Sequence, residues 1–401
     1  MIESLLKTQV ISPLETRFKM NQQLVHTVKL KFTKEFNSTP LMIFSPGRIN
    51  IIGEHTDYND GFVFPAAVDK GIVAGLFKSN SDQSTAYAID KNEKIFFQAK
   101  DVKPSKPGTW HNYILGVVAE INKKNLPLGN FNIAFAGNIP RGAGMSSSAA
   151  LENSVVFGLN ELFGLNLSKE EMIFISQKAE HHFVGVNCGI MDQYASMFGI
   201  ENNALHLDCR SIQANPFKIE LGEYQLLLIN TNVKHTLSDS AYNNRRAVCE
   251  HISKLLTIKA LRDATKEMIN SIQDQVSKED YQKVLFIIQE NQRTIDASKA
   301  IIEGDLNRLG ALFYQSHEGL QHLYKVSCEE LDFLVDATRD NKNILGSRMM
   351  GGGFGGCTIN LIKISEVPSF SKYISKVYFK QFNINCSIYD VNLSDGTHII
   401  K

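Results

Sequence analysis

The sequence predicts an α+β protein of two domains, and three observations support this prediction. Nine of the ten prolines lie at or before Pro216, and the remaining one is Pro368. Before Pro216, short apolar runs are separated by Gly, Pro and Asn turns, which is typical of strands mixed with helices. After Pro216, apolar residues recur at helical spacing over a long proline-free stretch. We therefore expect one α+β domain over residues 1–215 and a second over residues 216–401.

The elements of the first domain follow from the period of its apolar side chains. Apolar and β-branched runs between turn residues predict strands at residues 41–44, 71–77, 131–136 and 204–208. The last of these runs alternates apolar and polar residues, which indicates a half-buried strand. Good helix formers without proline predict helices at residues 149–162 and 169–182.

The second domain opens with a predicted strand at residues 225–230. Its helical stretch carries apolar stripes that we expect to face the core: Val284, Leu285, Ile287 and Ile288, then Leu306, Leu309, Leu312 and Phe313. A further strand is predicted at residues 358–362, directly after a glycine cluster.

Charge and hydropathy exclude several classes of function. The 42 basic residues balance the 42 acidic ones, so the chain lacks the net positive charge typical of proteins that bind nucleic acid or anionic membranes. No apolar run approaches the roughly 18 residues that a bilayer span needs, and the N-terminal sequence does not resemble a secretion signal. We expect a cytoplasmic protein that acts on small molecules, without a nucleic-acid, membrane or obligate protein partner.

Cysteine and histidine spacing argues against a disulfide framework or a zinc site. The six cysteines are scattered singly, and a chain of this length buries enough apolar surface to fold without disulfides. His181 and His182 stand beside Glu180, but adjacent residues face different sides of a helix, so we do not expect them to share a metal ion.

Residues 45–58 (SPGRINIIGEHTDY) concentrate polar chemistry directly after a predicted strand. Six side chains able to bind hydroxyls or anions fall within eleven residues: Arg48, Asn50, Glu54, His55, Asp57 and Tyr58. Carboxylates accept hydrogen bonds from hydroxyls, and arginine donates in a fixed fork, so the set suits a hydroxyl-rich ligand beside an anionic group. A capped turn with surface ion pairs explains the same composition about equally well.

Residues 137–152 (GNIPRGAGMSSSAALE) have the features of an anion-binding loop that enters a helix. Gly142 and Gly144 allow close backbone approach, the serines can cap the helix, and the helix N-terminus favours phosphate. This is not a Walker A loop, because Ala143 stands where the lysine is required. We therefore expect a metal ion and the helix terminus to compensate the negative charge of a bound phosphate. A glycine turn with a serine cap explains one serine, but not three in a row.

Residues 349–358 (MMGGGFGGCT) hold five glycines in six positions before a predicted strand. Gly351, Gly353 and Gly356 satisfy a dinucleotide-binding spacing, but that motif follows a strand and opens a helix, so we reject a dinucleotide fold. A run so free in φ and ψ indicates a backbone that closely approaches another loop or a ligand.

In this order and spacing, the three segments resemble the GHMP kinase superfamily, and residues 47–58 resemble the signature of the galactokinases. Residues 187–193 (NCGIMDQ) resemble the catalytic segment of that family, and residues 242–246 (YNNRR) its sugar-contacting tyrosine region. The resemblance extends roughly from Ser45 to Thr358. It implies a ferredoxin-like C-terminal α+β domain, an active site in the cleft between the domains, and ATP-dependent phosphorylation of the anomeric hydroxyl of α-D-galactose in the Leloir pathway.

The resemblance also implies a role for each matching residue. Asp192 would be the catalytic base, with Arg48 as its electrostatic partner. The sugar would be held by Glu54, His55, Thr56, Asp57, Gly189 and Tyr242. The nucleotide phosphates would be wrapped by Gly142, Ala143, Gly144, Met145, Ser146, Ser147 and Ser148. Mg²⁺ would be held by Ser148 and Glu180, with nucleotide oxygens and water completing its shell.

Several points stay open at this level. Asp192 either removes the sugar proton early or mainly orients the hydroxyl. Trp110 and Tyr113 suit a core anchor as well as a nucleotide contact. Two other functions compete: an N-acetylgalactosamine kinase, and a non-catalytic sensor that binds galactose and ATP. We also expect the glycine run to lie against the phosphate-binding segment, so that Gly353→Val would impair ATP use while sparing the fold.

Overall fold

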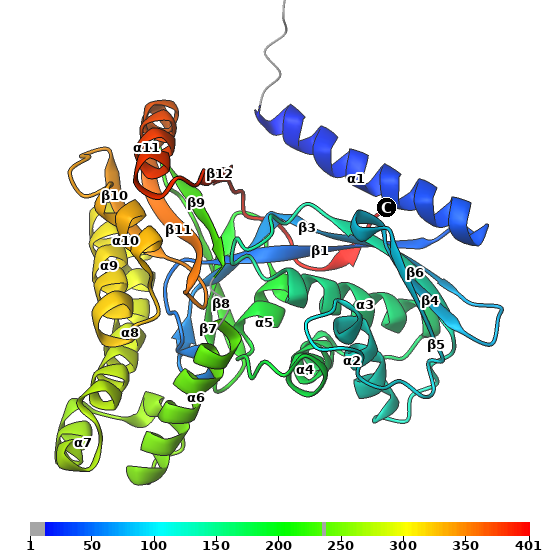
Figure 1. Ribbon diagram of the computed structural model, residues 1–401, viewed down its shortest axis with the longest axis horizontal. Coiled ribbons are helices and arrows are strands. Elements are labelled where there is room, and N and C mark those ends of the chain that lie inside the picture. Colours follow the sequence, from blue (N-terminus) through cyan, green and yellow to red (C-terminus); the bar gives the residue numbers. More distant parts are fainter. Residues whose placement is uncertain (1–12, 235–237) are drawn as a thin grey trace, which may run out of the picture.

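The computed structural model describes residues 13–234 and 238–401, which form two sheet-and-helix layers side by side (Figure 1). The first layer is a six-stranded sheet, and its strands stand in the order β13 (His398–Ile399), β1 (Leu41–Asn50), β3 (Pro65–Lys78), β6 (Phe131–Gly137), β4 (Ser84–Ala88) and β5 (Glu93–Phe97). All neighbours are antiparallel except β4 and β6, which are parallel.

Helices cover both faces of this sheet. One face lies under α1 (Pro13–Phe36), which buries Val28 and Phe32 completely. The other face packs on α3 (Ser147–Phe163) and α5 (Met191–Phe198), and α2 (His111–Asn122) and α4 (Lys169–Ala179) pack against α3 (Figure 1). Because both faces are covered, most of β1 and β3 is buried rather than alternating with solvent.

The second layer is a four-stranded antiparallel sheet in the order β10 (Ile344–Met349), β11 (Gly355–Lys363), β9 (Tyr224–Lys234) and β12 (Ser387–Asp390). The helices between β9 and β10 are α6 (Ser238–Leu255), α7 (Lys266–Ser271), α8 (Lys278–Glu303), α9 (Leu306–Glu318) and α10 (Glu329–Asp336), and α11 (Val367–Phe382) lies between β11 and β12. This sheet has the expected ferredoxin-like arrangement. Along the chain, one strand is followed by helices, two strands, a helix and a last strand.

A small sheet of β2 (Phe62–Val63), β7 (Asn203–Asp208) and β8 (Gln213–Lys218) lies between the two layers. The predicted domain division falls inside β8, and β13 pairs with β1, so the end of the chain returns to the first sheet. The domain boundary between residues 215 and 216 stays a prediction.

The predicted strands lie within β1, β3, β6, β7, β9 and β11, and the predicted helix at residues 149–162 lies within α3. The predicted helix at residues 169–182 differs in its last turn. There α4 ends at Ala179, and a π-helical turn, η3 (Glu180–Val184), follows it. Such wider turns are frequent at functional sites, and this one begins at an expected metal ligand.

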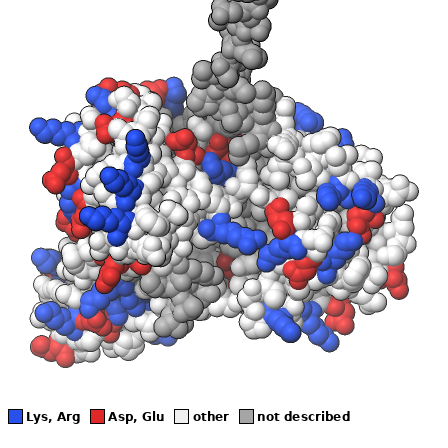
Figure 2. All heavy atoms as spheres, turned by 45° about the horizontal axis from the view of Figure 1, so that its top comes forward, with Lys and Arg blue, Asp and Glu red and all other residues white. Residues whose placement is uncertain are grey.

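The surface agrees with the balanced composition. On the face drawn in Figure 2, basic and acidic side chains are interspersed. Among the helices of residues 13–234 and 238–401, none combines the length and the apolar character needed to cross a membrane.

Candidate active site

Two cavities lie next to the N-terminus of α3. The smaller cavity, of about 130 Å³, is lined by residues of the first polar motif, the segment around Asp192, α6 and the glycine run (residues 351–356). The larger cavity, of about 450 Å³, is lined by Ser147 and Ser148, Arg141, and aromatic and aliphatic side chains of the first sheet and α2. Residues 141–148, here called the serine loop, connect the two, because Ser146 hydrogen bonds to Asp192 in the wall of the smaller cavity.

Arg48 and Asp192 form a two-point ion pair in the wall of the smaller cavity. Arg48 Nε lies 2.7 Å from Asp192 Oδ1, and Nη2 lies 2.8 Å from Oδ2. Arg48 is almost fully buried, and the charge of Asp192 raises the pKa of its guanidinium against the opposing effect of burial. Its third nitrogen, Nη1, donates to the carbonyl of Gly144. Arg48 therefore fixes both the expected base and the serine loop.

The serine loop is held in an unusual backbone conformation. Gly142 and Gly144 have φ of +67°, and Ser146 has φ of +56°, a left-handed value that is rare for a residue with a Cβ. The hydroxyl of Ser146 donates to Asp192 Oδ2, and within the described chain its side chain does not cap α3. The first N–H groups of α3 therefore stay available for an anion.

Two predicted members of the serine loop face the protein core instead of a cavity. Ala143 and Met145 are each 1% exposed and pack in the apolar cluster between the two layers. Met145 contributes through its carbonyl, which accepts a hydrogen bond from Arg48 N at 3.1 Å. Any contact of these two residues with a ligand would have to come from their backbone.

Carboxylates crowd the boundary between the two cavities. The side chain of Glu180 accepts hydrogen bonds from Ser148 and from Gln193 Nε2, the latter at 3.0 Å. Burial, together with the charge of Asp192, raises the pKa of Glu180 to about 7. Glu152 lies close by, and burial and the charge of Glu180 raise its pKa well above the usual range. A carboxylate and a hydroxyl at one point form a donor set suited to a hard divalent cation.

The remaining wall of the smaller cavity is polar and aromatic. Burial lowers the pKa of His55 to about 3, so the ring is neutral, and its Nδ1 lies 2.8 Å from Tyr58 Oη. Tyr242, from α6, packs its ring 5.4 Å from that of His55. Burial, reinforced by the charge of Asp192, raises the pKa of Asp57 to about 7. Gly189 lies against Asp57, because a Cβ at this position would stand 2.0 Å from Asp57 Oδ2.

Two predicted sugar contacts have other partners in the structure. Thr56 is fully buried, and its hydroxyl donates to the carbonyls of Gly53 and Phe62, so it stabilises the turn and does not line the smaller cavity. Glu54 lines the cavity, but Oε1 accepts from Arg348 Nη1 and Gly351 N, each at 2.9 Å, and Oε2 accepts from Asn50 Nδ2 at 3.0 Å.

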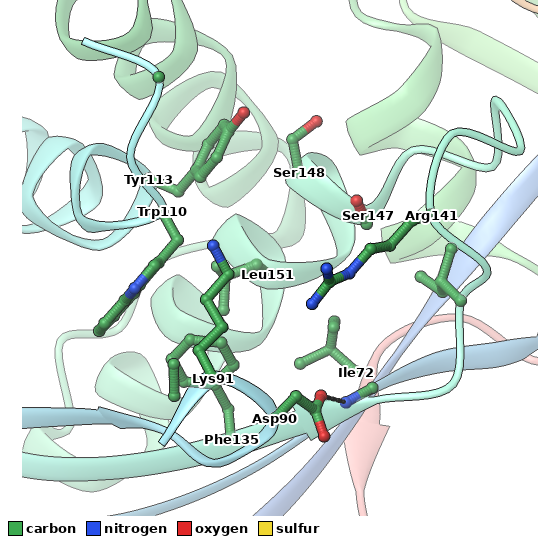
Figure 3. Close-up of a pocket in the computed structure, with 14 residues that line it drawn as sticks. Ile72, Asp90, Lys91, Trp110, Tyr113, Phe135, Arg141, Ser147, Ser148 and Leu151 are labelled. Atoms are coloured by element: carbon green, nitrogen blue, oxygen red, sulfur yellow. Dashed lines mark hydrogen bonds between the residues drawn. The ribbon is translucent and has the colours of Figure 1, made fainter. Parts of the chain in front are cut away.

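The larger cavity contains Trp110 and Tyr113, whose role the sequence left open (Figure 3). Trp110 belongs to the core cluster of the first layer and also lines this cavity, with Nε1 donating to Glu93 Oε2 at 2.8 Å. It is thus both a core anchor and a cavity wall.

The adjacent residues His181 and His182 have separate partners. His182 Nδ1 lies 2.8 Å from Glu120 Oε1, and His181 Nε2 donates to the Cys188 carbonyl at 2.8 Å.

Three segments of the chain match known family descriptions. Residues 30–76 match the galactokinase galactose-binding signature, residues 112–200 the GHMP kinases N-terminal domain, and residues 297–374 the GHMP kinases C-terminal domain. The galactokinase of Thermosipho africanus (strain TCF52B) is 40% identical over 361 residues, which are 90% of this chain and all of that protein. The chain belongs to the galactokinase family.

Other relatives agree with this assignment. The galactokinase of Clostridium acetobutylicum is 38% identical over 368 residues, covering 90% of this chain and 95% of that protein. Lactococcus lactis galactokinase, solved in complex with galactose, superimposes with a TM-score of 0.90 at 33% identity, covering 94% of this chain and 99% of the other. Methanococcus jannaschii mevalonate kinase, at 17% identity and a TM-score of 0.64 over 89% and 99% of the chains, shares the fold.

Within this galactokinase family member, the glycine run lies against the serine loop, as the sequence predicts. A Cβ on Gly356 would stand 3.4 Å from the Gly142 carbonyl, and one on Gly351 would stand 3.6 Å from the Gly144 carbonyl. Gly353 is different. Its Cβ would stand 2.1 Å from the Val326 carbonyl, so valine there would disturb the local fold and would not act on ATP use alone. The expectation that this variant spares the fold is wrong.

Sequence reasoning missed two buried groups that hold this galactokinase site together. Arg348 is fully buried and donates to Glu54 and to the carbonyls of Asn50, Ile51 and Met349. Gln193 Nε2 lies between Glu152 and Glu180, at 3.4 and 3.0 Å from their oxygens. A charged residue inside an apolar strand was the available signal for Arg348, because such a residue is rarely buried without a partner.

Proposed function

We propose that this chain transfers the γ-phosphoryl group of ATP to the anomeric hydroxyl of α-D-galactose, giving galactose 1-phosphate and ADP. One observation supports this most: the Arg48 and Asp192 pair stands where the smaller cavity meets the serine loop. A sugar hydroxyl in the smaller cavity and a phosphoryl group at the N-terminus of α3 would meet at this pair. Phosphoryl transfer depends mainly on such positioning and on charge stabilisation.

Galactose would occupy the smaller cavity. The carboxylate of Asp57 can accept hydrogen bonds from sugar hydroxyls, the neutral His55 ring and Tyr242 supply further polar contacts, and Gly189 leaves room for Asp57 to stand where it does. Glu54 is proposed to shape this wall through Arg348 and Gly351 in addition to any sugar contact. The Lactococcus lactis relative, solved in complex with galactose, supports galactose as the sugar.

Asp192 is proposed as the base for the anomeric hydroxyl. Its carboxylate already accepts hydrogen bonds from two Arg48 nitrogens and from Ser146, which fixes its orientation. Arg48 also lies next to the point where charge develops on the transferred group, and it can stabilise that charge. Both the orienting role and proton removal are consistent with this geometry.

ATP would bind in the larger cavity, with its phosphates at the serine loop. Mg²⁺ fits Ser148 and Glu180, whose hydroxyl and carboxylate already meet. Among the described residues no three His, Cys, Asp or Glu side chains are grouped as a metal site, so phosphate oxygens and water would complete the coordination shell. When bound, the ion would compensate part of the phosphate charge. We also propose that the enzyme works in the cytoplasm, where ATP is available.

A coupled assay of ADP release with MgATP tests this function. Wild type should turn over galactose, and Asp192→Asn should lower kcat by about a hundredfold or more while galactose still binds. Glucose and N-acetylgalactosamine serve as comparison sugars. Turnover on N-acetylgalactosamine alone would replace the substrate, and binding of galactose and ATP without ADP release would make the protein a sensor.

A further inference from the structure

A basic side chain in the larger cavity has no assigned role. Arg141 opens the serine loop, and its guanidinium points into this cavity from the side opposite Lys91 (Figure 3). In residues 13–234 and 238–401, no hydrogen bond or ion pair engages this guanidinium. The backbone of Arg141 is held from the second layer, because Asn230 Nδ2 donates to its carbonyl at 3.4 Å. The residue is therefore anchored at its backbone, whereas its charged end is exposed and has no partner among the described residues.

The position of Arg141 matches a need of the serine loop. Ala143 replaces the lysine of a Walker A loop, and it is buried, so that position supplies no positive charge. The N–H groups at the start of α3 provide only partial charge to an anion. An arginine two residues before Ala143 can supply a full charge from the same loop, and its planar fork matches two phosphate oxygens.

Lys91 provides a second cation on the facing wall. It ends the short 3-10 helix η2 (Ile89–Lys91) between β4 and β5, and its side chain is exposed. Its charge interacts with the carboxylate of Glu93, whose oxygens also lie 2.8 Å from Trp110 Nε1 and 2.9 Å from His111 Nε2. Because Lys91 already interacts with a carboxylate, it is a weaker candidate than Arg141 for contact with an anion.

We propose that Arg141 binds the polyphosphate of the nucleotide and takes the place of the missing loop lysine, with Lys91 as a weaker second cation. This inference rests on the proposed function, which puts ATP in the larger cavity. Because no described residue hydrogen bonds or pairs with the guanidinium, it can turn onto a phosphate without breaking a contact within residues 13–234 and 238–401. Its exposure means that the contribution depends on ionic strength.

A second arrangement competes with this one. Asp90 lines the same cavity, and its Oδ2 accepts a hydrogen bond from Gly137 N at 2.9 Å, which leaves Oδ1 for another donor. If Arg141 pairs with Asp90 instead, its side chain forms part of the wall around the base or the ribose and does not contact phosphate. The two arrangements differ in which part of the nucleotide responds to substitution of Arg141.

Binding of adenosine, AMP, ADP and ATP separates the two arrangements. Trp110 is the only tryptophan of the chain and lines the larger cavity, so its fluorescence is a direct probe, with titration calorimetry as a second measurement. We expect Arg141→Gln to weaken the binding of ATP about tenfold and the binding of adenosine less than twofold. The loss of ATP affinity should shrink as the salt concentration increases. Arg141→Lys should fall between wild type and Arg141→Gln, and Lys91→Gln should give a smaller loss of the same kind.

Lys376→Gln, an exposed lysine on α11, is the matched control and should bind ATP as wild type does. Equal weakening of adenosine and ATP in Arg141→Gln would assign Arg141 to the wall formed with Asp90 and overturn the proposal. Unchanged ATP affinity in that variant would also overturn it. In both cases galactose-dependent ADP release by wild type would leave the proposed function standing, so the two failures are distinguishable.

Discussion

The smaller and the larger cavity differ in how their charged groups are held. At the smaller cavity, two buried arginines are each paired with a carboxylate of the protein: Arg48 with Asp192, and Arg348 with Glu54. In the larger cavity, the walls are mostly aromatic and aliphatic, and the basic groups Arg141 and Lys91 are exposed. The arginines at the smaller cavity are thus already bound to groups of the protein, whereas the basic side chains at the larger cavity are exposed to solvent.

The two kinds of wall suit ligands of different chemistry. A neutral sugar offers hydroxyls, and discrimination among hydroxyl patterns needs acceptors and donors fixed within a buried frame. A polyphosphate offers concentrated charge, which backbone N–H groups and flexible cations bind without such a frame. The buried frame has an energetic cost, because its charges must be desolvated and paired.

The largest effect should come from breaking the buried frame. We expect Arg348→Met to lower the free energy of unfolding by about 3–5 kcal/mol, since it leaves the Glu54 carboxylate buried without its cation and three carbonyls without their donor. Urea denaturation measures this loss. The double variant Arg348→Met/Glu54→Gln should recover part of the stability, because the unpaired charge is then removed. A loss below 1 kcal/mol would contradict the view that this cavity depends on paired buried charge.

A pH-dependent effect should come from Asp57. Burial raises its pKa from 3.8 to about 7, so the folded state holds this proton more tightly than the unfolded state between about pH 4 and 7. The contribution of Asp57 to the free energy of unfolding therefore falls as pH rises through that window. Asp57→Asn should gain about 1–3 kcal/mol relative to wild type between pH 5 and pH 8.

Denaturant unfolding at the two pH values measures the Asp57 effect, with the exposed Asp274→Asn as control. If the difference between Asp57→Asn and wild type were the same at both pH values, the raised pKa would be contradicted. The smaller cavity would then not contain a carboxylate that burial keeps protonated.

The smallest effects should separate neighbouring serines across the boundary of the two cavities. Ser146→Gly removes the hydrogen bond to Asp192, so we expect kcat to fall about tenfold with the KM for ATP nearly unchanged. Glycine adopts the φ of +56° freely, so stability should not fall. Ser147→Ala, on the larger cavity, should raise the KM for ATP about two- to threefold and spare kcat. Steady-state kinetics with both substrates varied gives both values, and identical profiles for the two variants would contradict this division.

Local patterns in the sequence predicted much of the fold and part of the site. The period of apolar residues located the strands in β1, β3, β6, β7, β9 and β11, because a buried face imposes its spacing on the chain. The motifs located the serine loop and the segment around Asp192. Other features depend on contacts between residues that are far apart in the sequence, and the local spacing of residue types does not predict them. The pairing of β13 with β1 and the burial of Arg348 against Asn50, Ile51 and Glu54 are of this kind.

Residue types and their local order already establish the chemical groups of this protein and the short segments that hold them: Arg48, Asp57 and Asp192, three serines at a helix start, and a run of glycines. The partners of these side chains follow from tertiary contacts. Thr56 stabilises a turn, Met145 is buried in the core, Ser146 hydrogen bonds to Asp192, and Arg141 lines the larger cavity without a partner among the described residues. The physical reason is that residue type and spacing set what a side chain can do, whereas burial and long-range hydrogen bonds decide which of its possible partners it meets.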